Sequence, residues 1–168
     1  RKGDFGAAER ELRAVVSDQP ERVAALLWLA KAVRAQDRPQ AALDLYERAL
    51  ALEAAGDVLV EAVALAASTG APEVARRILT AFRATPQTEV DAALARGILA
   101  AAEGQPGKAE RELRGALALE PARVEALQRL VDLLDAAGRP KEATAALRRA
   151  AARTPDSAEV QALLRDRG

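Results

Sequence analysis

The sequence predicts an all-helical fold of about ten helices that pack in antiparallel pairs. About a quarter of the 168 residues are alanine and only 2% are aromatic, so the apolar half of the chain has small side chains that suit closely packed helices. An alanine recurs at a nearly constant spacing, and turns rich in glycine and proline recur at the same spacing. Such a fixed period indicates a stack of repeated helix pairs.

The recurring alanine marks one helix of each pair. Successive copies are 34, 33, 34 and 34 residues apart. A larger apolar residue follows each alanine by four positions, one helical turn further on, so the two side chains lie on one face. The pairs are Ala8 and Leu12, Ala42 and Tyr46, Ala75 and Leu79, Ala109 and Leu113, and Ala143 and Leu147. We therefore predict five helices with the same buried stripe.

A turn precedes each of these helices. Glycine or a polar residue ends the preceding helix, and in the last four turns a proline begins the next one. The segments are Lys2-Gly3-Asp4, Gln36 to Pro39, Gly70 to Pro72, Gly104 to Pro106 and Gly138 to Pro140. Each turn therefore joins two antiparallel helices.

The other helix of each pair has apolar or small residues at i, i+3, i+4 and i+7. The four sets are Leu26, Leu29, Ala30 and Val33; Val60, Val63, Ala64 and Ala67; Leu94, Gly97, Ile98 and Ala101; and Leu127, Leu130, Val131 and Leu134. A longer turn in the third pair would bury Arg96 as an uncompensated charge, so we assign the shorter turn there.

Helix pairs with these residues at a period near 34 resemble the tetratricopeptide repeat. The last full copy carries Leu127, Leu130, Val131, Leu134, Gly138, Ala143, Leu147, Ala150 and Pro155 at the family's positions. Essentially the whole chain shares the resemblance, although Phe82 and Pro86 depart from the pattern. It implies a right-handed α–α superhelix in a single array of residues 1–168. The expected divisions are a truncated repeat at 1–22, four repeats at 23–56, 57–89, 90–123 and 124–157, and a capping helix at 158–168.

Both ends of the chain fall within a repeat. Arg1 lies in the turn inside a repeat, so the helix over residues 4–18 lacks the partner that would cover Phe5, Ala8 and Leu12. We expect the parent protein to continue upstream, or this face to form a homodimer through helix 4–18. At the other end, residues 158–167 form a lone helix with Val160, Leu163 and Leu164 on one face.

The resemblance implies that the first helices of the repeats line a concave groove that holds a peptide or helix of a partner protein. Positions two, five, six, nine and twelve of each first helix would point inward. The predicted groove residues are Leu27, Trp28, Lys31, Arg34, Val58, Glu61, Leu65, Leu99, Gln128, Asp132 and Asp135. The predicted surface changes from basic through apolar to acidic, and we expect Trp28 to be its main anchor.

We therefore predict a protein–protein interaction scaffold, and a structural or oligomerisation module is the alternative. That module would orient an upstream catalytic domain or an envelope or secretion assembly. Some family members clamp a terminal carboxylate between Lys, Arg and Asn residues, but this sequence contains no Asn. Val58 and Leu65 can equally pack against neighbouring helices.

Composition argues against other function classes. The chain has no Cys and no His, so it lacks the usual nucleophile, base and zinc ligands, and we predict no enzyme activity, cofactor or metal site. We expect Asp132 and Asp135 to lie on a solvent-exposed helix face and to bind no metal. We expect the basic pairs Arg76-Arg77 and Arg148-Arg149 to be ordinary solvent-exposed charges, offset by Glu73 and Glu142.

The charge and hydropathy of the chain exclude two further partner classes. The net charge of zero argues against nucleic acid, and the longest apolar run is eight residues, Val23 to Ala30, too short for membrane insertion. Arg greatly outnumbers Lys, which together with the alanine bias suggests a bacterial source. The compartment, cytoplasmic or periplasmic, stays open.

Overall fold

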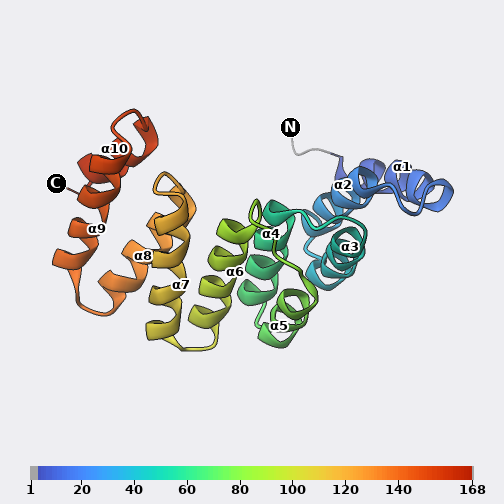
Figure 1. Ribbon diagram of the computed structural model, residues 1–168. Coiled ribbons are helices and arrows are strands. Elements are labelled where there is room, and N and C mark those ends of the chain that lie inside the picture. Colours follow the sequence, from blue (N-terminus) through green and yellow to red (C-terminus); the bar gives the residue numbers. More distant parts are fainter. Residues whose placement is uncertain (1–3, 168) are drawn as a thin grey trace. The chain divides into compact units, whose positions relative to one another are not determined.

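The computed structural model describes residues 4–167, which form ten α-helices and no strands (Figure 1). The first residues of the predicted Lys2-Gly3-Asp4 turn, and Gly168, lie outside the described part. The helices are α1 (Phe5–Asp18), α2 (Val23–Arg34), α3 (Pro39–Leu52), α4 (Gly56–Ser68), α5 (Pro72–Ala81), α6 (Glu89–Ala102), α7 (Pro106–Leu119), α8 (Val124–Ala136), α9 (Pro140–Arg153) and α10 (Ala158–Arg165). The all-helical prediction is confirmed.

The chain divides into two compact units between Thr85 and Pro86. Helices α1–α5 form the first unit and α6–α10 the second. In each unit the main packing is between helices that follow one another in the sequence. This nearest-neighbour packing is typical of repeat proteins, in which each helix pair is stabilised by the next one.

The recurring alanines lie on the faces by which their helices pack. Ala42, Ala75, Ala109 and Ala143 are fully buried, as their spacing predicts. Ala8, in the first helix, is only half-buried. A methyl side chain at these positions lets two backbones pack at short distance, which a larger side chain would prevent.

The pairing of α6 with α7 is especially close at Gly97. A Cβ atom added there would lie 2.9 Å from Cγ and 3.0 Å from Cδ2 of Leu113, which is itself buried. Real Cβ atoms do not approach neighbours this closely, so a larger residue at this position would force the buried Leu113 side chain to move.

Three of the turns use glycine for a left-handed backbone. Gly70, Gly104 and Gly138 have φ angles of 72°, 68° and 71°. The turn between α2 and α3 places Asp37 in the same conformation, with φ of 59°. A non-glycine residue adopts this conformation at a steric cost, so this turn is less favourable than the other three.

Helix α5 differs from the other second helices. It has 10 residues, whereas α3, α7 and α9 have 14, because the chain leaves the helix at Phe82. Ile78 is buried, and Leu79, predicted to lie in the buried stripe, is only half-buried. The buried stripe predicted through Leu79 is therefore only partly formed in α5, where Ile78 is the more buried residue.

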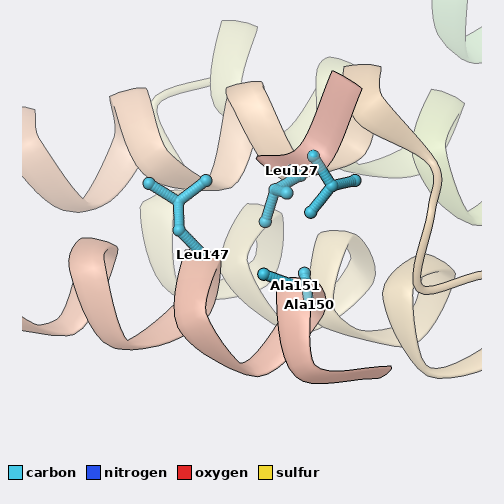
Figure 2. Packing of buried hydrophobic residues seen from close by; sticks show 5 residues of the cluster. Leu127, Leu147, Ala150 and Ala151 are labelled. Carbon is cyan, nitrogen blue, oxygen red and sulfur yellow. The ribbon is translucent and has the colours of Figure 1, made fainter. Parts of the chain in front are cut away.

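Helix α10 closes the core of the second unit. Val160 packs with Leu127 of α8 and with three residues of α9, Leu147, Ala150 and Ala151. Figure 2 shows the side chains of α9 directed toward Leu127. Ser157 caps the helix by accepting a hydrogen bond from the backbone N–H of Val160 at 3.4 Å. Because so short a helix is marginal in water on its own, α10 depends on this packing for its stability.

Helix α1 is attached to the next pair by a buried carboxylate. Glu9 is 8% exposed and accepts hydrogen bonds from Arg13 at 2.9 Å, Gln36 at 2.8 Å and Arg38 at 2.8 Å. The bonds from Arg13, Arg38 and Gln36 lower the pKa of Glu9 to about 2. Phe5, by contrast, is 43% exposed.

Candidate functional site

The most exposed large apolar side chain of the described residues is Trp28 of α2, at 64%. The packing stripe of α2 is complete without it, because Leu26, Leu29, Ala30 and Val33 are all buried. Trp28 therefore lies outside the core. A wet indole on a rigid helix makes a large contact area available at little conformational cost.

Charged side chains of two helices surround the indole. The Nζ atom of Lys31 lies 5.6 Å from the centroid of the Trp28 ring, a cation–π distance. Glu61 of α4 binds Arg34 at 2.7 Å and lies 3.7 Å from the Lys31 Nζ. These four side chains form one surface of the first unit, which we call the Trp28 surface.

The Trp28 surface is less basic than the sequence predicts. Glu61 contacts both cations, Lys31 and Arg34, and all three side chains remain partly exposed. One positive charge therefore remains uncompensated among them. Such exposed pairs add little stability, but they fix the direction of the side chains that a partner meets.

A buried phenol lies beneath these charges. Tyr46 of α3 is fully buried, and its hydroxyl has no hydrogen-bond partner in the described structure. Burial is the main cause that raises the pKa of Tyr46, and the neighbouring Glu61 carboxylate raises it further. Glu61 thus lies between a buried phenol and two surface cations.

The other predicted groove residues of the first unit are less accessible. Leu27 and Leu65 are half-buried, whereas Val58 is only 5% exposed. Val58 is therefore buried and offers a partner almost no area. Leu27 and Leu65 retain apolar surface on the same helices, α2 and α4, that carry the Trp28 surface.

In the second unit, Leu99 is 7% exposed and belongs to the core. Gln128, Asp132 and Asp135 lie on α8 and are at least partly exposed. Asp135 binds Arg167, which follows α10, and the Arg167 guanidinium lowers the pKa of Asp135. Asp132 lies between two open cavities and lines both of them.

The two cavities that share Asp132 have apolar floors. One, of about 400 Å³, is lined by Val131, Leu147 and Leu163 with Gln128, Asp166 and Arg167. The other, of about 300 Å³, is lined by Ile98, Ala101, Leu113 and Leu133 with Gly97 and Arg129. The predicted site residues thus form two separate sets, one on each unit.

Several ion pairs could not be found by sequence periodicity. Arg96 is half-exposed and binds Glu112 at 2.7 Å and Glu89 at 2.8 Å. On the second helices, Glu142 binds Arg139 at 2.6 Å, and among the described residues no ion pair joins it to Arg148 or Arg149.

The described residues contain no group of three or more Asp, Glu, Cys or His side chains that could hold a metal ion. Over the same part of the chain, no helix has the length and apolar character needed to cross a membrane.

Two family models, both described as Tetratricopeptide repeat, match residues 1–58 and 100–166. No curated protein matches the sequence.

Solved structures share the fold at low identity. A tetratricopeptide-repeat protein of Thermus thermophilus, TTC0263, is 23% identical with a TM-score of 0.67, over 98% of this chain and 91% of that one. The type IV pilus biogenesis factor PilW is 21% identical with a TM-score of 0.69, over 90% and 71%. MamA from Desulfovibrio magneticus RS-1 is 19% identical with a TM-score of 0.67, over 94% and 90%.

Proposed function

We propose that this chain, which belongs to the tetratricopeptide-repeat family, binds an apolar segment of a partner protein at the Trp28 surface. The family membership makes it a protein-interaction repeat module. The observation that carries the finer proposal is the 64% exposure of Trp28 beside a complete packing stripe. An indole that the core does not need offers a partner a large contact area with few rotatable bonds to fix.

The charges around Trp28 favour a particular kind of segment. An apolar side chain of the partner would cover the indole, and Leu27 and Leu65 would extend that contact across α2 and α4. The Lys31, Arg34 and Glu61 side chains lie at its edge, where a carboxylate of the partner would bind the cations. An extended or helical segment with one large apolar residue next to an acidic residue would contact both the apolar surface and the cations.

The proposal is tested by selecting partners and removing the indole. A phage library of random linear peptides is panned on the protein, and the enriched peptides are measured on Trp28→Ala. We expect binding to weaken by roughly 2 kcal/mol, about thirtyfold, because hot-spot aromatics carry contributions of this size. The melting temperature should stay within a few degrees, since Trp28 is outside the core.

Leu52→Ala is the matched control, because Leu52 is another exposed apolar residue of the first unit. It should leave peptide binding unchanged. The Trp28 emission should also shift to the blue when a selected peptide binds. Peptides that bind Trp28→Ala as tightly as the parent would contradict the proposal, and so would a stability loss of about 3 kcal/mol, which is typical of a core residue.

The alternative function, a structural or oligomerisation module, is favoured by the face of α1. Phe5 is 43% exposed and Leu12 is half-buried, so this helix presents apolar area to solvent. Light scattering across protein concentration separates the two functions. A monomer favours the peptide-binding module, whereas a dimer that Phe5→Glu dissociates favours the structural one.

A further inference from the structure

The second unit contains a pocket that none of the predicted site residues lines. It lies between α7 and α9 and has a volume of about 170 Å³. Leu117, Leu130, Ala146 and Ala150 form its apolar part, with Pro121 from the turn after α7. These side chains bury most of their own area in the core, so the pocket is part of the folded structure.

Three arginines line the pocket together with these apolar residues. They are Arg114 of α7 and Arg149 and Arg153 of α9. Arg114 binds Glu110 at 2.9 Å, and Arg153 lies 3.5 Å from the carbonyl oxygen of Leu117. Arg149 is exposed and makes no ion pair or hydrogen bond with any residue that the structure describes.

Two carboxylates of the helices that line the pocket, Glu110 of α7 and Glu142 of α9, are already bound. Glu110 accepts hydrogen bonds from Arg139 at 2.7 Å as well as from Arg114. Glu142 is held by Arg139 at 2.6 Å. Hydrogen bonds from Arg139 are the main cause that lowers the pKa of Glu110 and of Glu142, so both carboxyl groups stay ionised. Arg149 and Arg153 line the apolar pocket and make no ion pair with any residue that the structure describes.

We infer that this pocket binds an acidic segment of a partner protein, with one apolar side chain in the pocket and a neighbouring carboxylate on Arg149 and Arg153. The volume suits one side chain of the size of leucine. The planar guanidinium of arginine binds carboxylates through two parallel hydrogen bonds, a geometry that a lysine would not provide. The net charge of the whole chain is zero, which argues against a general polyanion surface.

This interaction would be separate from the Trp28 surface. The pocket belongs to the second unit, and all its lining residues lie between positions 114 and 153. Loss of binding at Trp28 and loss of binding at Arg149 can therefore be measured independently, and either proposal can fail alone.

The experiment uses three capped peptides and the complete chain. The probe is Ac-Gly-Glu-Leu-Glu-Gly-NH2, compared with the versions in which Gln replaces both Glu residues or Ala replaces Leu. Binding is followed by the NMR shifts of the methyl groups of Leu117, Leu130, Ala146 and Ala150. We expect the probe at millimolar concentration to shift these methyls, and both altered peptides to bind much more weakly.

Arg149→Ala and Arg149→Glu should weaken the probe by about tenfold or more, since a charge-assisted contact at the pocket is lost. Arg148→Glu is the matched control: it changes the same charge on the adjacent, exposed residue of α9, which does not line the pocket. It should alter the affinity by less than about twofold, the size expected of a screened charge. Unchanged amide spectra away from the pocket would show that both variants fold.

Three outcomes would overturn the inference. The first is equal weakening by Arg148→Glu and Arg149→Glu, which would indicate attraction by charge alone. The second is equal binding of the Gln peptide, which would exclude carboxylate recognition. The third is binding of phosphatidylglycerol vesicles that depends on Arg149 while the peptide shifts no pocket methyl, which would assign the pocket to anionic lipid.

Discussion

Gly97 and Gly115 occupy the interiors of neighbouring helices and differ in what an added methyl group would meet. At Gly97 the new Cβ would lie 2.9 Å from Leu113 Cγ, whereas at Gly115 nothing lies within 4 Å. The same substitution therefore tests packing at one site and helix propensity at the other.

We predict that Gly97→Ala lowers the free energy of unfolding by about 1 to 2 kcal/mol. Overpacking against Leu113 costs about 1 to 3 kcal/mol and outweighs the gain of up to about 1 kcal/mol in helix propensity. Gly115→Ala should instead raise stability by up to about 1 kcal/mol. Urea unfolding of the two variants measures both effects. A Gly97→Ala protein as stable as Gly115→Ala would show that α6 and α7 pack less closely than described.

Asp37 is the second residue at which a local backbone effect is measurable. Its φ of 59° is the left-handed conformation that Gly70, Gly104 and Gly138 adopt in the other turns. We predict that Asp37→Gly raises stability by about 0.5 to 1 kcal/mol, because glycine adopts this conformation without the steric cost. Thermal unfolding provides the measurement. Gly138→Ala should lower the stability, because alanine adopts the left-handed conformation at a steric cost. A loss of stability in Asp37→Gly would mean that the aspartate side chain stabilises this turn.

At the scale of one element, Glu9 adds a buried polar contact to the packing of α1 on α2. The carboxylate accepts hydrogen bonds from Gln36 and Arg38, which lie in the turn before α3, so one side chain of α1 contacts the next helix pair. The apolar side of the same helix is only partly covered, as the exposure of Phe5 shows. A helix held in this way opens more readily than those packed on both sides.

We predict that α1 is destabilised selectively by acid. The pKa of Glu9 is about 2 in the folded chain, below its ordinary value of 4.5. The ionised form is therefore favoured by folding, and its contribution is present above about pH 4.5 and is lost as the pH falls toward 2. Hydrogen exchange of residues 6–16, relative to α3, should accelerate between about pH 5 and about pH 3 beyond the intrinsic change in rate.

Glu9→Gln should show this acceleration already at neutral pH and should lose the pH dependence. Glu11→Gln changes an exposed carboxylate of the same helix and should do neither. If the two variants exchange alike, the buried network does not hold α1 in place.

The individual elements also show which parts of the structure local sequence rules could predict. Ala42, Ala109 and the turn glycines were predictable because side-chain size and backbone conformation are properties of single positions. Trp28 was predictable as an exposed residue because four others already fill the stripe of α2. The burial of Val58 and Leu99 was not, since it depends on contacts with other helices that the repeat pattern does not specify.

Contacts between helices were the least predictable feature. The chain has 25 basic and 25 acidic residues, so many pairings of Arg and Glu are compatible with the repeat. The partners of Glu61 and Glu142 depend on side-chain reach across helices and cannot be read from the repeat period. The greater burial of Ile78 than of Leu79 in α5 likewise cannot be read from the repeat period.

At the scale of the whole molecule, the division between Thr85 and Pro86 has a consequence for unfolding. Each helix packs mainly against its neighbours in the sequence, so the stability of a unit is the sum of adjacent interfaces. A destabilised interface in one unit then affects that unit first. Single-transition behaviour, which compact small domains usually show, is not expected of such a chain.

We predict that Gly97→Ala unfolds the second unit at lower urea concentration while the first unit keeps its midpoint. Tyr46 of the first unit and Leu127 of the second are both fully buried, so their folded-state amide cross-peaks report the two units separately. In the parent chain the two midpoints can lie close together. In Gly97→Ala the Leu127 midpoint should fall, because the clash with Leu113 lies inside the second unit, and the Tyr46 midpoint should not. Asp37→Gly should raise the Tyr46 midpoint and leave Leu127 unchanged. If either substitution moves both midpoints equally, the chain unfolds as one cooperative structure and the division at Thr85 has no energetic meaning.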